Sequence, residues 1–75
     1  GIILKLKELK MITCINKNNT FRIETGEIVT VEKMDLIPDV GILVYWSIGN
    51  SDSIFRDSYN DAIKFLNDEK AVLIN

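Results

Sequence analysis

Four aspartates are spaced through the C-terminal half of the chain, where their charge could recognise a partner. They are Asp52, Asp57, Asp61 and Asp68, with Glu69 directly after the last. Carboxylates gathered on one surface attract a basic protein and can also imitate nucleic-acid phosphates. These four aspartates are therefore the candidate protein-binding residues. The competing interpretation is local, because acids near a helix start stabilise the helix dipole by a few tenths of a kcal/mol.

Basic side chains are concentrated in the N-terminal half, and one aromatic residue lies among them. The candidate nucleic-acid-binding set is Lys5, Lys7, Lys10, Lys17, Arg22 and Phe21. A cationic groove that displays aromatic rings binds single strands by neutralising phosphates and stacking on bases. The pI of about 4.9 is far below the values above 9 that are typical of nucleic-acid-binding domains. Nucleic-acid binding is therefore the alternative hypothesis, and a lysine-rich edge that discourages aggregation explains the same residues.

The residues that most enzymes need are missing. The chain has no histidine and one cysteine, and its four glycines lie singly at positions 1, 26, 41 and 49. Without histidine there is no Ser-His-Asp or Cys-His nucleophile, and one cysteine cannot form a structural zinc site. Isolated glycines do not make a phosphate-binding loop. We expect a protein that is not an enzyme, with no catalytic residue, metal or cofactor.

The loop at 48–53 carries backbone and side-chain oxygens that could in principle surround a cation or a phosphate. It lacks acids at the third and fifth ligand positions of a calcium loop, and it lacks the closing glutamate. We therefore expect a structural turn.

Cysteine use and hydropathy bear on the compartment. Cys14 stands alone, so it cannot form an internal disulfide, and small secreted domains are usually cross-linked. A cytoplasmic location is therefore expected, with Cys14 acting as a small buried hydrophobic residue within 11–15. No stretch approaches eighteen consecutive apolar residues, so no membrane span is expected.

The length of 75 residues and the hydrophobic fraction of 47% favour one folded domain, residues 1–75. Its first part, 9–34, reads as an antiparallel meander with strands at 9–15, 20–23 and 27–34. Asn16 to Asn19 provide turn chemistry. A three-residue loop at 24–26 with a bulge at Gly26 places Phe21 and Ile23 on one face with Val29 and Val31.

The second part of the chain is divided by Pro38, which cannot donate to a strand ladder. The apolar run 41–48 predicts a central strand covered on both faces, with Trp46 anchoring the core. Ser58, followed by Asp61 three residues later, resembles a capping box and begins a helix at about 58–67. A buried stripe follows at Tyr59, Ala62, Ile63 and Leu66. Residues 70–74 read as a final strand.

The expected fold is therefore α+β: a mostly antiparallel, twisted sheet of about five strands with one packed helix. The segment 2–8 fits either a strand or a short helix. Twelve isoleucines are many for so small an interior, so a homodimer is expected, with strand addition by residues 2–6 as its route.

The leading hypothesis is a non-enzymatic protein-binding module, such as a regulator, inhibitor or accessory factor. It would act through a sheet edge or the acidic helix face. Heavy use of Ile, Asn and Lys fits an AT-rich bacterial or phage genome.

Overall fold

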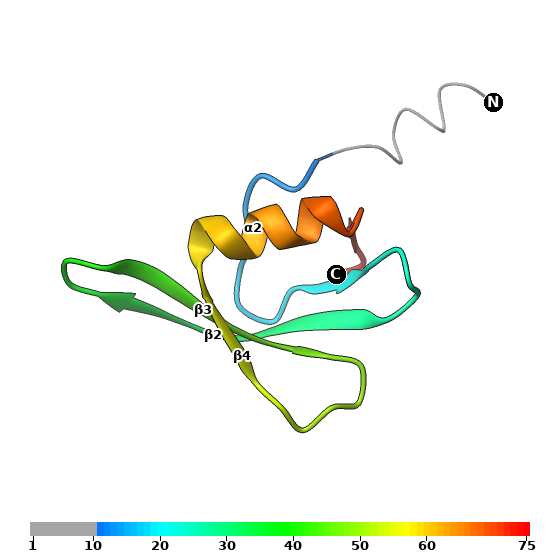
Figure 1. Ribbon diagram of the computed structural model, residues 1–75, viewed down its shortest axis with the longest axis horizontal. Helices are drawn as coiled ribbons and strands as arrows, with labels where there is room; N and C mark the ends of the chain where they lie inside the picture. The colour runs from blue at the N-terminus through cyan, green and yellow to red at the C-terminus, as the bar shows by residue number, and fades with distance from the viewer. Residues whose placement is uncertain (1–10) are drawn as a thin grey trace.

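The computed structural model describes residues 11–75, in which a helix lies across one face of an antiparallel sheet (Figure 1). In chain order the elements are β1 (Thr20–Arg22), β2 (Ile28–Ile37), β3 (Gly41–Ile48), β4 (Phe55–Ser58), α2 (Tyr59–Asp68) and β5 (Val72–Leu73). The strands lie in the order β4-β3-β2-β1-β5, and each neighbouring pair is antiparallel. The expected α+β class is confirmed. The prediction for segment 2–8 lies outside the described residues.

The β1–β2 hairpin has the bulged three-residue loop that the sequence predicts. The Gly26 N–H donates to the Ile23 carbonyl at 2.9 Å, and the Ile23 N–H donates to the Glu27 carbonyl at 3.0 Å. Gly26 has a φ of 94°, which glycine adopts without the strain that a Cβ would cause. This register sets Phe21 opposite Val29, with both side chains buried. The predicted apolar face is therefore confirmed.

The first expected strand, 9–15, is wrong in its described part, because residues 11–16 form an irregular segment without strand pairing. Asn67 of α2 accepts from the Ile12 N–H at 2.8 Å through Oδ1 and donates to the Ile12 carbonyl at 2.9 Å through Nδ2. The Tyr59 hydroxyl accepts from the N–H of buried Ile15 at 3.0 Å. Side chains of the helix thus satisfy backbone groups that a neighbouring strand was expected to satisfy.

The predicted turn at 16–19 is present, although it does not join two strands. Asn18 has a φ of 71°, in the left-handed region that asparagine tolerates. The Asn19 N–H donates to the Asn16 carbonyl at 3.1 Å, and the Asn16 N–H donates to Asn19 Oδ1 at 2.7 Å. The turn delivers the chain to the edge of β2.

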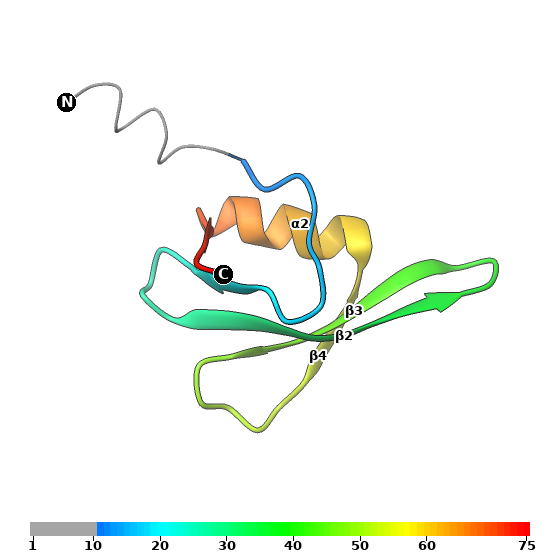
Figure 2. The ribbon, with the colours of Figure 1, turned by 180° about the vertical axis from the view of Figure 1, so that it is seen from behind.

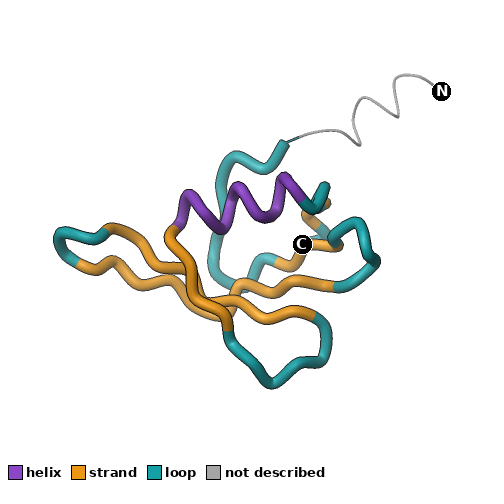
Figure 3. The backbone as a smooth tube through the Cα atoms, in the orientation of Figure 1, coloured by secondary structure: helices purple, strands orange, loops and turns teal. Residues whose placement is uncertain are grey.

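β2 continues past the expected end at residue 34 as far as Ile37 and forms a projecting hairpin with the start of β3. We call this hairpin, residues 33–42, the arm; Figure 3 shows it extending beyond the end of α2. The predicted break at Pro38 is confirmed, because Val40 N–H donates to the Ile37 carbonyl at 3.1 Å and closes the turn. β3 covers the same residues as the predicted strand 41–48.

β4 has no counterpart in the sequence analysis, which passes from the loop at 50–53 to the helix start. It pairs with β3 and sets Phe55 beside Trp46 and Asp57 beside Val44. The predicted helix is confirmed as α2, and its cap Ser58 accepts from the Asp61 N–H at 3.1 Å through Oγ. The C-terminal strand is shorter than the expected 70–74, since β5 has two residues, and it pairs with β1.

The core lies between α2 and the sheet face beneath it. Its buried apolar members are Ile15, Phe21, Ile23, Val29, Val31, Val44, Trp46, Ala62, Leu66 and Ala71. Trp46 anchors this core, as predicted, and its ring stacks against Phe55 and Phe65 with centroid distances of 4.9 and 4.8 Å.

The opposite face of the sheet carries no helix from the described part of the chain, as the view from behind shows (Figure 2). Tyr45 is half-buried there, and the Lys33 ammonium lies 5.0 Å from its ring centroid. The expectation that strand 41–48 is covered on both faces is therefore wrong. One helix of ten residues can cover only one face of this sheet.

Candidate interaction surfaces

The structure distributes the four candidate aspartates over a loop, a strand and both ends of the helix. Asp52 is exposed in the loop before β4, Asp61 lies in the first turn of α2, and Asp68 ends that helix. Lys64 forms an ion pair with Asp68 at 2.8 Å, and both side chains are largely exposed. The hydrogen bond to Asp68 and its charge raise the pKa of Lys64 above its ordinary value. A lysine thus partly neutralises the helix acids.

Asp57 has a structural partner that the sequence analysis misses. Its Oδ2 accepts a hydrogen bond from Trp46 Nε1 at 2.8 Å in a partly buried setting. A buried indole N–H needs such an acceptor. Reversing the charge of Asp57 would therefore perturb the core, so this residue cannot test partner binding by itself.

The candidate nucleic-acid set is also divided. Lys5, Lys7 and Lys10 lie outside the described residues, whereas Lys17 and Arg22 are exposed on the 16–19 turn and on β1. Phe21 is 1% exposed and belongs to the core. Its assignment as a stacking aromatic is wrong, because a buried ring offers no face to a base.

Cys14 is exposed, which contradicts the expected buried position. The irregular path of residues 11–16 turns Ile15 into the core, and Ile12 packs against it, so Cys14 faces outward. At the 48–53 loop, Ser51 N–H donates to the Ile48 carbonyl at 3.2 Å, and Ser53 N–H donates to Ser51 Oγ at 3.1 Å. These bonds are those of a structural turn.

A small void lies in the core, beneath the helix. This void of about 10 Å³ between α2 and the sheet is lined only by apolar side chains, among them Val44, Trp46 and Phe65. It holds about one water-sized sphere and offers no polar partner to a ligand. Within the same residues, no group of three or more His, Cys, Asp or Glu side chains is placed to hold a metal ion. None of the helices described there is long and apolar enough to cross a membrane.

The arm carries a group of exposed apolar side chains that the sequence analysis also misses. Leu36 is 76% exposed and Val40 68%, and Ile37 and Ile42 remain more than one third exposed. Four large aliphatic side chains thus gather on one projecting hairpin. The available signal is the apolar residues on both sides of Pro38 and Asp39, which a short protein has little interior to cover.

One backbone edge of the arm has no strand partner within residues 11–75. β1 pairs with β2 as far as Thr30, and the turn before β1 reaches Val31, whose N–H donates to the Asn19 carbonyl at 2.9 Å and whose carbonyl accepts from the Asn18 N–H at 2.8 Å. A bulge shifts the β2–β3 register between Val31 and Lys33. Beyond the bulge, no strand of residues 11–75 other than β3 pairs with β2.

The chain matches no protein-family model, no curated protein and no solved structure. Among the surfaces described above, the arm combines exposed aliphatic side chains with a backbone edge that no strand of residues 11–75 pairs.

Proposed function

We propose that this chain is a non-enzymatic protein-binding module, of the regulator, inhibitor or accessory-factor kind, and that its arm contacts the partner. The observation that carries the proposal is the exposure of Leu36, Ile37, Val40 and Ile42 on one projecting hairpin. Exposed apolar groups concentrated in one place mark protein interaction sites more often than scattered single residues do.

The acidic candidates support this function less well than the arm does. Asp57 is engaged by Trp46, and Asp68 is engaged by Lys64. Aliphatic side chains bind by removing apolar surface from water, so they favour a protein partner over a phosphate backbone. The arm is thus the better candidate for the surface that contacts a protein partner, and nucleic-acid binding has no comparable support from the described residues.

The test compares cross-linking from two exposed positions in cells that produce the protein. A photo-reactive amino acid in place of Val40 should yield a discrete protein adduct, whereas the same probe in place of Asp52 should not. The arm variant Leu36→Ser, Ile42→Ser should lose the Val40 adduct.

A matched control is available in exposed apolar residues away from the arm. Ile54→Ser with Val72→Ser removes side chains that are 54% and 43% exposed and should leave the Val40 adduct unchanged. Circular dichroism checks that each variant is folded. An adduct that survives the arm substitutions, or that forms equally from position 52, would contradict the proposed contact surface.

A further inference from the structure

The outer edge of the arm presents backbone groups that could pair with a further strand. Antiparallel strands direct alternate residues toward alternate neighbours. The Ile37 carbonyl accepts the turn bond from Val40, and Lys33 and Asp35 face Tyr45 and Leu43 of β3. Met34 and Leu36 therefore direct their N–H and C=O groups outward. This edge has no partner strand within residues 11–75.

We propose that the occupant of this edge is a second copy of the chain, with the two β2 strands paired antiparallel about a two-fold axis at Met34. The inference rests on the proposed function, because it names a partner for the same arm. Pairing identical edges closes the assembly at two copies and leaves no β2 edge unpaired between them.

The charges of the arm select this register. With the axis at Met34, Lys33 of each copy lies opposite Asp35 of the other, giving two opposite-charge pairs. With the axis at Asp35, two aspartates would face each other, which is destabilising. With the axis at Leu36, Met34 would face Pro38, which has no N–H to donate. Of these three registers, only the first is both charge-complementary and able to form its hydrogen bonds.

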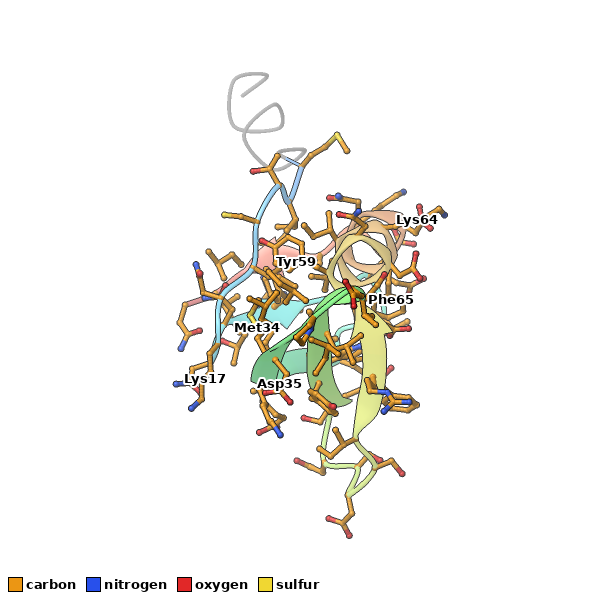
Figure 4. All side chains as sticks on the ribbon, turned by 90° about the vertical axis from the view of Figure 1, so that its left-hand side faces the viewer. Lys17, Met34, Asp35, Tyr59, Lys64 and Phe65 are labelled. Carbon is orange, nitrogen blue, oxygen red and sulfur yellow. The ribbon has the colours of Figure 1, made fainter. Side chains whose placement is uncertain are left out.

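The apolar side chains agree with the same register. Figure 4 shows Met34 and Asp35 on opposite sides of the sheet, with Met34 toward α2. Across the axis, Met34 meets Met34 of the second copy, and Leu36 lies diagonal to it, within reach of a long side chain. The pairing would thus cover Leu36, which is the most exposed large apolar residue within residues 11–75.

Free edges of monomeric proteins are often protected by a lysine, a proline or a bulge, and this edge has all three. The oligomeric state therefore decides between a protected edge and a pairing edge. Sedimentation equilibrium of the full chain over a range of concentrations should show a reversible monomer–dimer equilibrium. A chain that remains monomeric at its highest soluble concentration overturns the inference.

Charge variants test whether the dimer uses the proposed register. Lys33→Asp places acids opposite acids in the dimer, and Asp35→Lys places bases opposite bases. Each variant alone should dimerise about tenfold to hundredfold more weakly, since two favourable pairs become two repulsive ones. Mixed in equal amounts, the two should form a heterodimer at close to the original affinity.

The mixture of the two variants distinguishes the effect of charge pairs between copies from the effect of the ion pair within one copy. Lys33 and Asp35 are also bonded to each other at 3.2 Å within the chain, and both single variants break that pair. The double variant Lys33→Asp, Asp35→Lys keeps both kinds of pair and should dimerise as the original chain does. The register is overturned if the single variants dimerise as tightly as the original chain. It is also overturned if the equal mixture of the two variants does not regain close to the original affinity.

Failure of this inference is distinguishable from failure of the proposed function. A monomeric chain whose Val40 probe still captures a different protein through the arm contradicts the second-copy inference alone. A dimer that persists in the arm variants, together with a Val40 adduct that survives the same substitutions, contradicts both.

Discussion

Two side chains of α2 form hydrogen bonds to the backbone of the irregular segment 11–16. Removing them should show how much these bonds contribute to the free energy of unfolding. Asn67 makes two hydrogen bonds to the backbone of Ile12, at 2.8 and 2.9 Å. Tyr59 accepts from the Ile15 N–H at 3.0 Å, and Ile15 is 2% exposed. We predict that Asn67→Ala and Tyr59→Phe each lower the free energy of unfolding.

The magnitudes follow from the number of bonds and from their burial. Asn67→Ala removes two partly buried bonds, each with a net value of about 1 kcal/mol, so a loss of about 1–2 kcal/mol is expected. Tyr59→Phe removes the bond that the Ile15 N–H donates at 3.0 Å and a longer one, of 3.4 Å, that the Tyr59 hydroxyl donates to the Ile15 carbonyl. Loss of the partner of a backbone N–H in a residue that is 2% exposed costs about 1–3 kcal/mol. Each substitution removes two bonds, and the effect of Tyr59→Phe should be at least as large as that of Asn67→Ala because Ile15 is buried.

The two substitutions should not be additive, because both act on one segment. Once either anchor is lost and residues 12–15 detach, the second anchor has less to hold. The double variant should therefore lose less than the sum of the single losses, with a coupling of about 0.5 kcal/mol or more.

Urea unfolding followed by Trp46 fluorescence gives the free energies, and hydrogen exchange of the Ile12 and Ile15 amides reports on the segment itself. Asp68→Asn is the control, since it alters the neighbouring helix position and removes only an exposed ion pair, so little or no change in the free energy of unfolding is expected. If Asn67→Ala leaves both stability and Ile12 exchange unchanged, the side-chain bonds do not hold this segment.

Three further predictions concern single side chains. Asp57→Ala should destabilise the fold by about 1–3 kcal/mol, because the Trp46 N–H loses its acceptor. Asp57→Asn retains an acceptor oxygen and should destabilise the fold less. Urea unfolding measures both losses. Gly26→Ala should lower the free energy of unfolding by about 1 kcal/mol or more. The cause is backbone strain at a φ of 94°, because a Cβ there meets nothing within 4 Å. An unchanged midpoint of thermal unfolding would contradict this prediction. The pKa of Lys64 should lie above its ordinary value and fall in Asp68→Asn, as nuclear magnetic resonance titration can show. Because that pKa is raised, the pair contributes fully at neutral pH and its contribution disappears as the pH rises past the pKa of Lys64.

Local rules predict those parts of the fold that depend on a few neighbouring residues. Gly26 identifies the bulged loop because that loop needs one left-handed residue. Ser58 and Asp61 identify the helix start because the cap is a bond across three residues. The β3 boundaries follow from Gly41 and from the uninterrupted apolar run after it. In each case the determining contacts are close in sequence.

The errors arise where a distant element satisfies the backbone. Residues 9–15 alternate as a strand does, yet Asn67, more than fifty positions away, provides the bonds at Ile12. β4 is short and carries Arg56 and Asp57 at its centre, so its pairing with β3 leaves no apolar pattern to detect. Spacing also could not place the four candidate aspartates, because their grouping depends on where the chain turns after β3.

The arm follows from a mismatch of lengths that no local pattern reveals. Ten residues of α2 span about 15 Å, whereas the ten residues of β2 span about 33 Å. The helix therefore covers only part of the β2–β3 hairpin, and the remainder must project. Projection alone does not require apolar side chains, since polar residues would form the same strands at positions facing water. The exposed Leu36, Val40 and Ile42 on that projecting part support the proposed binding surface, because Lys33, Pro38 and the bulge are enough to protect the edge without them.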